Sequence, residues 1–160
     1  MKRLVVYYSY GGHTKMIVDM VTAKKECDVL KIEPMVAYSD DYDYLVNEYQ
    51  DNANTDRNDP IKKISIDLKQ YDEIILGSPV WWYSIAPVVR TFLKEYDLSN
   101  KVIIPFATNA GWLGKTFKEI KKLCPNSTIK DEMNIVFTED HLENKLVTSQ
   151  KEIDKWIERL

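Results

Sequence analysis

Five short apolar runs alternate along the chain with segments of helical periodicity. The runs are almost continuous in aliphatic, β-branched and aromatic residues, a pattern typical of strands covered on both faces. They occupy residues 2–8, 28–33, 72–79, 101–111 and 133–137. Apolar residues three or four positions apart predict helices from Thr14 to Lys25, from about Asp41 to Gln50, from Ala86 to Tyr96, from Trp112 to Leu123 and from Thr148 to Leu160.

This alternation predicts one α/β domain over residues 1–160, with a parallel sheet and helices on both of its faces. Right-handed crossovers are the rule in such sheets. Ligands bind beyond the carboxyl ends of the strands, where the strand order reverses. We therefore expect the functional site at the connections that follow the first, third and fourth strands, which read SYGGHT, GSPVWWYS and TNAGWLG.

Three residues mark the expected boundaries of these elements. Pro87 fits the first turn of its helix, where a missing amide hydrogen costs nothing. Ser149 is a candidate N-cap for the last helix. Pro105 lies within the fourth apolar run and cannot donate to a strand ladder, so it indicates a bulge or a strand end.

Composition and charge narrow the classes of function. The 160 residues are 44% hydrophobic and 29% charged, as in globular proteins. No apolar run approaches the roughly 20 residues of a spanning helix, and the apolar start lacks a small-residue cleavage site, so we expect a cytoplasmic protein without a membrane segment. The net charge of −3 does not support nucleic-acid binding. Cys27 and Cys124 lie far apart and no histidines cluster, so neither a metal site nor a disulfide framework is expected.

The first connection has the parts of a phosphate cradle. Gly11 and Gly12 let the backbone turn and approach phosphate oxygens, while the helix that follows presents free amides and its positive dipole end. Ser9 and Thr14 offer hydroxyls, and His13 is expected to offer its backbone amide. Neither a triphosphatase loop nor a dinucleotide glycine pattern is present, so one terminal phosphate fits best. The alternative is a plain strand–helix turn with Thr14 as the cap.

The second connection offers aromatic surface, and the third offers small residues. Trp81 and Trp82 can stack on a flat conjugated ring. The alternative is that Trp81 packs inward while Trp82 covers a helix end. Backbone amides and carbonyls at the edge of a ring can come from Thr108, Asn109, Ala110 and Gly111, although Gly111 could equally serve only as a turn residue.

A phosphate cradle beside a flat apolar slot with polar edges describes flavin mononucleotide (FMN). The stretches YYSYGGHTK, YDEIILGSPVWWYSIAPVVRTFL and TNAG resemble the flavodoxin-like family, and the resemblance covers essentially the whole chain. It implies five parallel strands in the order 2-1-3-4-5, with FMN as the cofactor. By position, it implies phosphate contacts from Ser9, Gly11, Gly12, His13 and Thr14, with Tyr10 also among the cofactor-binding residues. It implies one side of the ring from Pro79, Val80, Trp81 and Trp82, and another side from Thr108, Asn109, Ala110 and Gly111.

The chain departs from small electron carriers of this family at one notable place. Such carriers have a glycine after the first ring-flanking aromatic residue, and its peptide flips to stabilise the semiquinone. Trp82 stands there in this chain, and the flipped conformation costs a bulky residue more than glycine. We expect electron transfer to redox partner proteins, or alternatively an NAD(P)H-dependent quinone or flavin reductase. A binding module with a vestigial flavin site ranks last. No catalytic acid or base stands out, and the oligomeric state stays open.

A tyrosine-rich, acidic segment spans residues 38–59. Its tyrosines are Tyr38, Tyr42, Tyr44 and Tyr49. We consider two interpretations, a partner or substrate surface and a solvated connection, and favour the second because surface loops vary widely. Residues 51–60, which read DNANTDRNDP, are predicted to form a loop.

Overall fold

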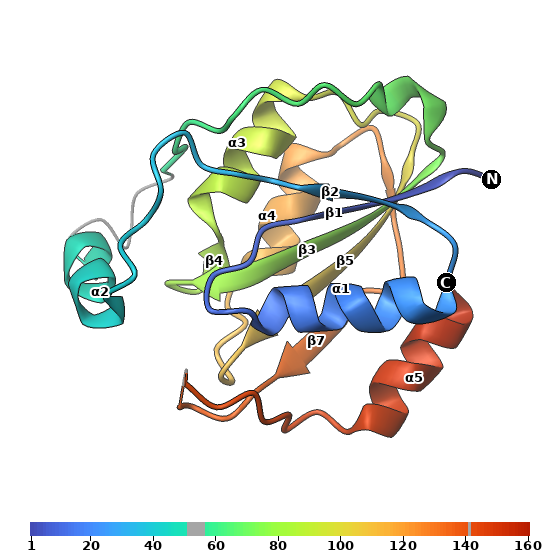
Figure 1. Ribbon diagram of the computed structural model, residues 1–160. Helices are drawn as coiled ribbons and strands as arrows, with labels where there is room; N and C mark the ends of the chain where they lie inside the picture. Colours follow the sequence, from blue (N-terminus) through green and yellow to red (C-terminus); the bar gives the residue numbers. More distant parts are fainter. Residues whose placement is uncertain (51–56, 141) are drawn as a thin grey trace.

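A parallel sheet with the strand order β2-β1-β3-β5-β6 forms the centre of the computed structural model, which describes residues 1–50, 57–140 and 142–160 (Figure 1). The strand β7 pairs with β5 on the same side as β6, so the two share one position in the sheet. The predicted order 2-1-3-4-5 is therefore confirmed. The parallel strands are β1 (Arg3–Tyr7), β2 (Asp28–Lys31), β3 (Glu73–Trp81), β5 (Val102–Asn109), β6 (Thr128–Ile129) and β7 (Met133–Val136).

The division of the last strand into β6 and β7 explains how Pro105 fits within the sheet. The strand β5 is continuous, and Pro105 pairs with Leu76 of β3. On the other side, β6 pairs with Val102 and Ile103, whereas β7 begins its pairing at Phe106. Pro105 therefore lies where the neighbouring strand is interrupted. The bulge or strand end expected at Pro105 is replaced by a break in the partner strand, which removes the need for a donor.

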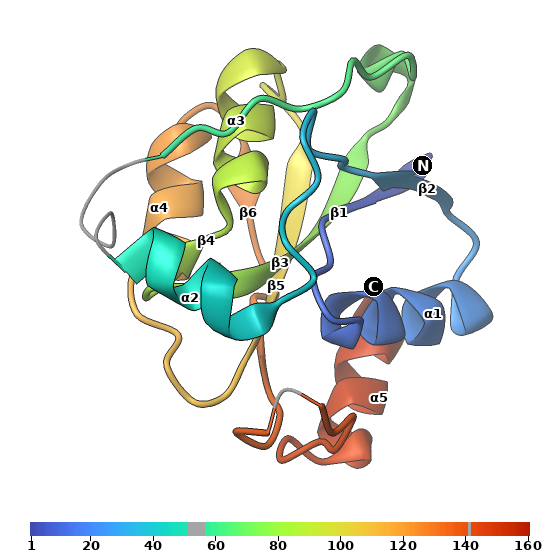
Figure 2. The ribbon, with the colours of Figure 1, turned by 60° about the vertical axis from the view of Figure 1, so that its left-hand side comes forward.

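Helices cover both faces of the sheet, as predicted (Figures 1 and 2). Successive strand residues point to opposite faces: Leu4 packs under α3 (Pro87–Glu95) and α4 (Thr116–Leu123), and Val5 packs under α1 (His13–Lys24) and α5 (Gln150–Arg159). On the second face the Trp156 ring is fully buried, and its Nε1 donates to the carbonyl oxygen of Asp131 at 2.8 Å. None of the described helices is long and apolar enough to cross a membrane.

The helix boundaries follow local backbone signals. Pro87 is the first residue of α3, and the Ser149 hydroxyl accepts a hydrogen bond from the Glu152 amide at the start of α5, so both predictions are confirmed. The helix α1 has Gly12 as its N-cap, so Thr14 does not cap it. The helix α4 begins at Thr116 instead of Trp112, because Gly114 adopts a φ of 57°, outside the right-handed helical region.

The connection between β2 and β3 runs to the carboxyl end of the sheet and back. There it forms the short helix α2 (Tyr42–Gln50), and it returns as an extended segment that ends in the 3-10 helix η1 (Leu68–Gln70) (Figure 1). A bridge between Pro34 and Ile61 pairs its two ends. The loop predicted at 51–60 lies partly outside the described residues, which resume at residue 57. The segment 34–61 is thus a closed loop that carries α2 over one edge of the sheet.

Candidate functional site

The three connections singled out from the sequence meet at the carboxyl end of the sheet. One cleft of about 350 Å³ brings together residues from all three connections and from α2. It is lined by Tyr10, Tyr42, Leu45, Val46, Val80, Trp81, Trp82, Tyr83, Asn109, Ala110 and Trp112, and we call it the aromatic cleft. A second cleft of about 640 Å³ adjoins it at Tyr10 and Tyr42; it is lined by Ser9, Tyr10, Gly11, Asp40, Asp41, Tyr42, Asp43, Leu142 and Asn144, and we call it the loop cleft.

The first connection presents a row of free amides. Among the residues that the structure describes, no acceptor is found for the backbone N–H groups of residues 10–14. Gly11 and Gly12 have φ angles of 79° and 99°, which L side chains rarely adopt, and open space surrounds both. The Lys15 amide donates to Ser9 Oγ at 3.1 Å, which leaves the Ser9 hydroxyl hydrogen available. This row at the start of α1 is the geometry of an anion site.

The Thr14 hydroxyl points toward the sheet. It lies 2.8 Å from the hydroxyl of Thr108, and both side chains are buried. This bond joins the first and third connections directly. Because the Thr14 hydroxyl is engaged there, Thr14 offers the loop its backbone amide.

The His13 ring holds a neighbouring segment in place. It stacks on the ring of Phe137 with centroids 4.0 Å apart and planes 4° apart. Its Nε2 lies 2.8 Å from the carbonyl oxygen of Glu143, to which the ring N–H donates. The imidazole therefore fastens the segment after β7 beside the loop cleft, and it is the His13 amide that belongs to the free row.

Trp81 and Trp82 lie at the tip of a β-hairpin, not in an open loop. The strand β3 extends through Trp81, which pairs with Ser84 of β4 (Ser84–Ile85). Trp82 and Tyr83 form the two-residue turn, with φ angles of 48° and 64°. This is the pattern of a type I′ turn, which normally favours Asn-Gly because bulky residues are strained at positive φ. Such strain persists only where the surroundings impose it.

Contacts from α4 and α3 hold this hairpin. The Lys115 amide donates to the Tyr83 carbonyl oxygen at 2.8 Å. Behind it, the buried Glu119 carboxylate accepts hydrogen bonds from Ser84 and Arg90. Burial alone would raise the pKa of Glu119, but these hydrogen bonds hold that pKa below its usual value. The ionised pair thus anchors the base of the hairpin.

Trp81 is surrounded by tyrosines. Its ring makes edge-on contacts with four of them, at centroid distances between 5.0 and 6.0 Å. They are Tyr8, Tyr10, Tyr38 and Tyr49. Trp81 is half-buried and also packs against the core beneath α3 and α4. The inward-packing interpretation therefore describes part of its surface, while another part lines the aromatic cleft.

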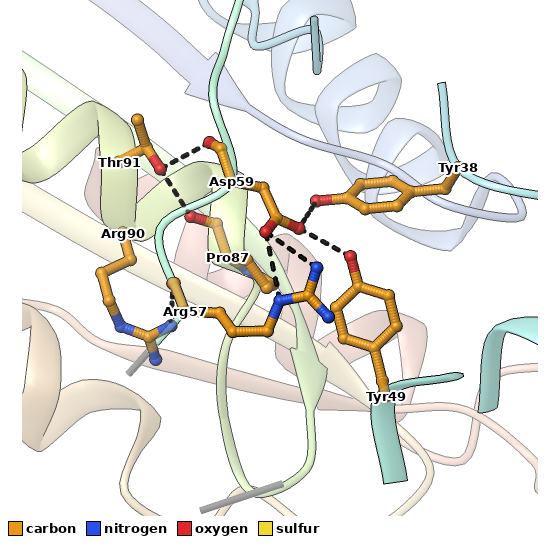
Figure 3. Close-up of polar contacts among 7 residues, drawn as sticks. All are labelled: Tyr38, Tyr49, Arg57, Asp59, Pro87, Arg90 and Thr91. Atoms are coloured by element: carbon orange, nitrogen blue, oxygen red, sulfur yellow. Dashed lines mark hydrogen bonds and ion pairs between the residues drawn. The ribbon is translucent and has the colours of Figure 1, made fainter. Parts of the chain in front are cut away.

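The Asp59 carboxylate holds two of these tyrosines (Figure 3). Its Oδ2 accepts hydrogen bonds from the hydroxyls of Tyr38 and Tyr49, each at 2.6 Å. Its Oδ1 binds the Arg57 guanidinium, which also lies 3.9 Å above the Tyr49 ring. Burial, with these hydrogen bonds to a carboxylate, raises the pKa values of both tyrosines well above 10. The interpretation of residues 38–59 as a solvated connection is wrong for Tyr38 and Tyr49.

The same hydrogen-bond network extends to α3, which packs on the sheet. The Thr91 hydroxyl donates to the Asp59 carbonyl oxygen at 2.6 Å, and the Arg90 guanidinium donates to the Arg57 carbonyl oxygen at 2.7 Å (Figure 3). We call Tyr38, Tyr49, Arg57 and Asp59 the Asp59 hub. It joins both legs of the closed loop to the helix that also anchors the hairpin. The position of α2 over the aromatic cleft is therefore fixed by side chains.

Of the residues expected from the sequence, the aromatic cleft gathers Tyr10, Val80, Trp81, Trp82, Asn109 and Ala110, while the loop cleft gathers Ser9, Tyr10 and Gly11. The two clefts are not lined by Gly12, His13, Thr14, Pro79, Thr108 or Gly111. Other residues line the clefts but were not expected from the sequence: Asp40, Asp41, Tyr42, Asp43, Leu45, Val46, Tyr83, Trp112, Leu142 and Asn144. The periodicity of Leu45, Val46 and Tyr49 indicated an apolar helix face, but nothing local indicated what it covers.

Negative charge lies close to the free amides. Asp40, Asp41 and Asp43 are exposed at the rim of the loop cleft. The pKa of Tyr10 is raised by burial and then by the charges of Asp40 and Asp41. An anion bound by the free amides would feel the same charges. Among the described residues, no group of three His, Cys, Asp or Glu side chains could hold a metal ion.

Comparisons with known proteins agree with this geometry. A crystal structure from Bacteroides eggerthii is similar, with 25% identity, a TM-score of 0.77 and coverage of 99% of this chain and 96% of that chain. A flavoprotein of Lactobacillus acidophilus in complex with FMN matches at 23% identity, with a TM-score of 0.68 and coverage of 97% of both chains. Oxidised flavodoxin 2 from Bacillus cereus matches at 17% identity, with a TM-score of 0.58 and coverage of 99% and 94%.

The sequence was also compared with individual curated proteins and with sequence models of whole families. No curated protein matches the chain closely enough to be significant. The sequence model of the flavodoxin family, however, matches residues 2–160. The chain therefore belongs to the flavodoxin family.

Proposed function

We propose that this protein binds FMN and takes part in electron transfer. The observation that carries the proposal is the row of free backbone amides at residues 10–14, which adjoins a cleft lined by aromatic side chains. The row suits a phosphate dianion, and the cleft suits a flat conjugated ring. The flavin supplies the redox chemistry when it is bound, and the protein supplies binding, orientation and exclusion of water.

The residues divide these tasks among themselves. The amides of residues 10–14 and the Ser9 hydroxyl would hold the phosphate. The hairpin and the backbone of Asn109 and Ala110, which line the aromatic cleft, would hold the ring, and α2 would exclude water from it. The Lactobacillus acidophilus flavoprotein, which was crystallised with FMN, supports this assignment through the shared fold.

The hairpin bears on whether electrons pass singly or in pairs. We expected the bulk of Trp82 to oppose the positive φ that a flipped peptide needs. Trp82 already adopts a φ of 48°, so that strain is present before any reduction. What opposes a flip is the hairpin, because Trp81 pairs with Ser84 and Tyr83 is bonded to Lys115. A two-electron reductase acting on a quinone or flavin is therefore the second candidate function.

The test is direct. The purified protein is heated, and the released cofactor is identified by mass; we expect FMN in a one-to-one ratio. Stoichiometric FAD without FMN would refute the proposal. A dithionite titration followed by absorbance then separates the two candidates. A large transient semiquinone supports the one-electron carrier, and its absence supports the reductase.

A further inference from the structure

Trp81 joins the aromatic cleft to a cluster of tyrosines. Its ring lines the cleft and also contacts four tyrosine rings edge-on. Indole and phenol rings are among the side chains that give up a single electron most readily, and rings in contact exchange electrons rapidly. An electron vacancy created on Trp81 can therefore pass to a tyrosine, and the surroundings of each hydroxyl decide which tyrosine receives it.

The four tyrosines differ in what their hydroxyls bind. An oxidised phenol is a very strong acid, so a tyrosine loses an electron readily where a base can take its proton. The Asp59 carboxylate is such a base, at 2.6 Å from the hydroxyls of Tyr38 and Tyr49 (Figure 3). The Tyr10 hydroxyl donates to a backbone carbonyl oxygen, which is a far weaker base. In the described part of the chain the Tyr8 hydroxyl has no hydrogen-bond partner.

Of the two tyrosines bound to Asp59, Tyr38 is the better electron donor. The centroids of the Tyr38 and Tyr49 rings lie 5.0 and 5.2 Å from that of Trp81, so distance does not separate them. The Arg57 guanidinium, however, lies 3.9 Å from the centroid of the Tyr49 ring, and a positive charge there opposes the removal of an electron. Within the described residues no cation lies over the Tyr38 ring. Tyr38 therefore gives up an electron more easily than Tyr49.

The Asp59 hub also keeps the Tyr38 proton in place until the ring is oxidised. Burial and the hydrogen bond to Asp59 raise the pKa of Tyr38 well above 10, so the phenol is neutral at physiological pH. The Asp59 side chain is mostly buried and is held by Arg57. A proton that moves from Tyr38 to Asp59 therefore stays beside the oxygen that released it.

We propose that Tyr38 is a redox-active tyrosine that reduces oxidised Trp81 and passes its hydroxyl proton to Asp59. Trp81 first loses one electron to a one-electron oxidant in the aromatic cleft, such as a photoexcited flavin or an oxygen-derived radical. One electron then moves from Tyr38 to the Trp81 radical cation, while the hydroxyl proton moves to Asp59. The products are intact Trp81, a neutral tyrosyl radical and a protonated carboxyl group.

The transfer restores Trp81 before its radical reacts irreversibly. A thiol, as a small reductant, returns one electron to the tyrosyl radical, and the proton moves back from Asp59. The role of a flavin as the oxidant rests on the proposed flavin function. The transfer from Tyr38 to Trp81 does not, because it involves the protein's own side chains alone.

Pulse radiolysis of the purified protein in azide solution, at neutral pH and in the dark, tests the transfer. Azide radicals oxidise tryptophan selectively, and absorbance distinguishes the tryptophan radical from the tyrosyl radical. We expect the tyrosyl radical to appear as the tryptophan radical decays, at a rate independent of protein concentration. Tyr38→Phe and Asp59→Asn should each slow this step at least about tenfold, because one removes the phenol and the other replaces the base with an amide. Tyr10→Phe, which alters another ring in contact with Trp81, is the matched control and should change the rate less than about twofold.

A solvent isotope effect separates proton transfer from a merely structural role of the hub. In D2O the step should be slower in the unmodified protein, because a deuteron moves together with the electron. Thermal unfolding establishes that each variant is folded at the temperature of the measurement. Tyr38→Phe, which keeps the ring, carries the test if Asp59→Asn does not fold.

Three results would overturn the inference. They are the absence of a tyrosyl radical that grows as the tryptophan radical decays, equal losses in Tyr38→Phe and Tyr10→Phe, and equal rates in H2O and D2O. Each of them leaves the proposed flavin function standing, because the azide radical replaces the flavin as the oxidant. Conversely, transfer that depends on Tyr38 in a protein that binds no flavin supports the redox-active tyrosine and refutes the proposed function.

Discussion

The Trp82 ring stacks on the Tyr49 ring, with centroids 5.8 Å apart and planes 20° apart. Trp82 belongs to the turn after β3, and Tyr49 belongs to α2, so this contact joins the strained hairpin to the helix over the aromatic cleft. The Tyr49 ring also contacts the guanidinium of Arg57. The Asp59 carboxylate binds both the Tyr49 hydroxyl and the Arg57 guanidinium. The shape of the aromatic cleft therefore depends on a residue that does not line it.

Asp59→Asn should destabilise the protein and weaken FMN binding. The substitution removes the charge that holds two tyrosine hydroxyls and Arg57. Hydrogen bonds to charged groups contribute about 1.5–3 kcal/mol each, and we expect a loss of that order in the free energy of unfolding. Guanidinium unfolding measures it. Asp43→Asn, at an exposed position of α2, is the control, and an equal loss there would show that Asp59 is not special.

Ser9→Ala should weaken FMN binding more than riboflavin binding. The hydroxyl that it removes caps the Lys15 amide and has a hydrogen free for a phosphate oxygen. A charge-assisted hydrogen bond contributes about 1.5–3 kcal/mol, so FMN affinity should fall roughly ten- to a hundredfold. Flavin fluorescence titration of apoprotein measures both ligands. Thr14→Val removes a hydroxyl that is bonded to Thr108, and it should affect FMN and riboflavin alike. Equal losses for Ser9→Ala would mean that Ser9 does not contact phosphate.

Trp81→Phe and Trp82→Phe should reduce the quenching of protein fluorescence that FMN causes. Both tryptophans line the aromatic cleft, whereas Trp156 is buried against the opposite face of the sheet. Trp81→Ala/Trp82→Ala should weaken FMN binding at least tenfold, because an aromatic pair contributes about 0.5–1.5 kcal/mol beyond burial. Trp156→Phe serves as the fluorescence control. If FMN quenched all the single variants equally, neither ring would lie against the flavin.

Gly114→Ala should destabilise the hairpin. Its φ of 57° strains any L side chain, and an added Cβ would lie 2.3 Å from the Tyr83 carbonyl oxygen. Gly111→Ala is the matched control, since Gly111 also has a positive φ but open space around it. Backbone strain affects both variants and is larger at Gly111, whose φ of 113° lies outside the left-handed region, so a greater loss in Gly114→Ala can come only from the clash. Thermal unfolding measures it. If both melting temperatures fell equally, Gly114 would not support Tyr83.

Stability should fall as the pH rises above about 10, the ordinary tyrosine pKa. Burial raises the pKa values of Tyr8, Tyr38 and Tyr49 in the folded protein. Above pH 10 the unfolded chain therefore loses tyrosine protons that the folded chain retains, so it binds fewer protons and unfolding becomes more favourable. Guanidinium unfolding at pH 9 and pH 11 measures the change. In Tyr38→Phe/Tyr49→Phe the decline should be shallower, and an unchanged slope would contradict this account.

The sequence by itself determined the alternation of strands and helices and hence the parallel sheet, while the strand order followed from the resemblance to the flavodoxin-like family. The alternation of apolar runs with helical periodicity depends on neighbours along the chain, and the carboxyl ends of parallel strands lie at the same end of the sheet, so the three connections were expected to meet there. Gly11 and Gly12 also indicated a turn from the local sequence alone, since glycine readily adopts such positive φ angles. Pro87 and Ser149 likewise indicated the starts of α3 and α5, because the preference of each residue for a helix start depends on the local backbone.

Only the tertiary structure decided how the site is closed. Asp59 binds Tyr38 from 21 residues away, and Thr91 binds Asp59 from 32 residues away, so no periodicity records these contacts. The same holds for the turn at Trp82 and Tyr83, where local preference opposes a positive φ and Lys115 and Glu119 overrule it. Local preferences are worth little free energy per residue, and a buried network between distant segments outweighs them.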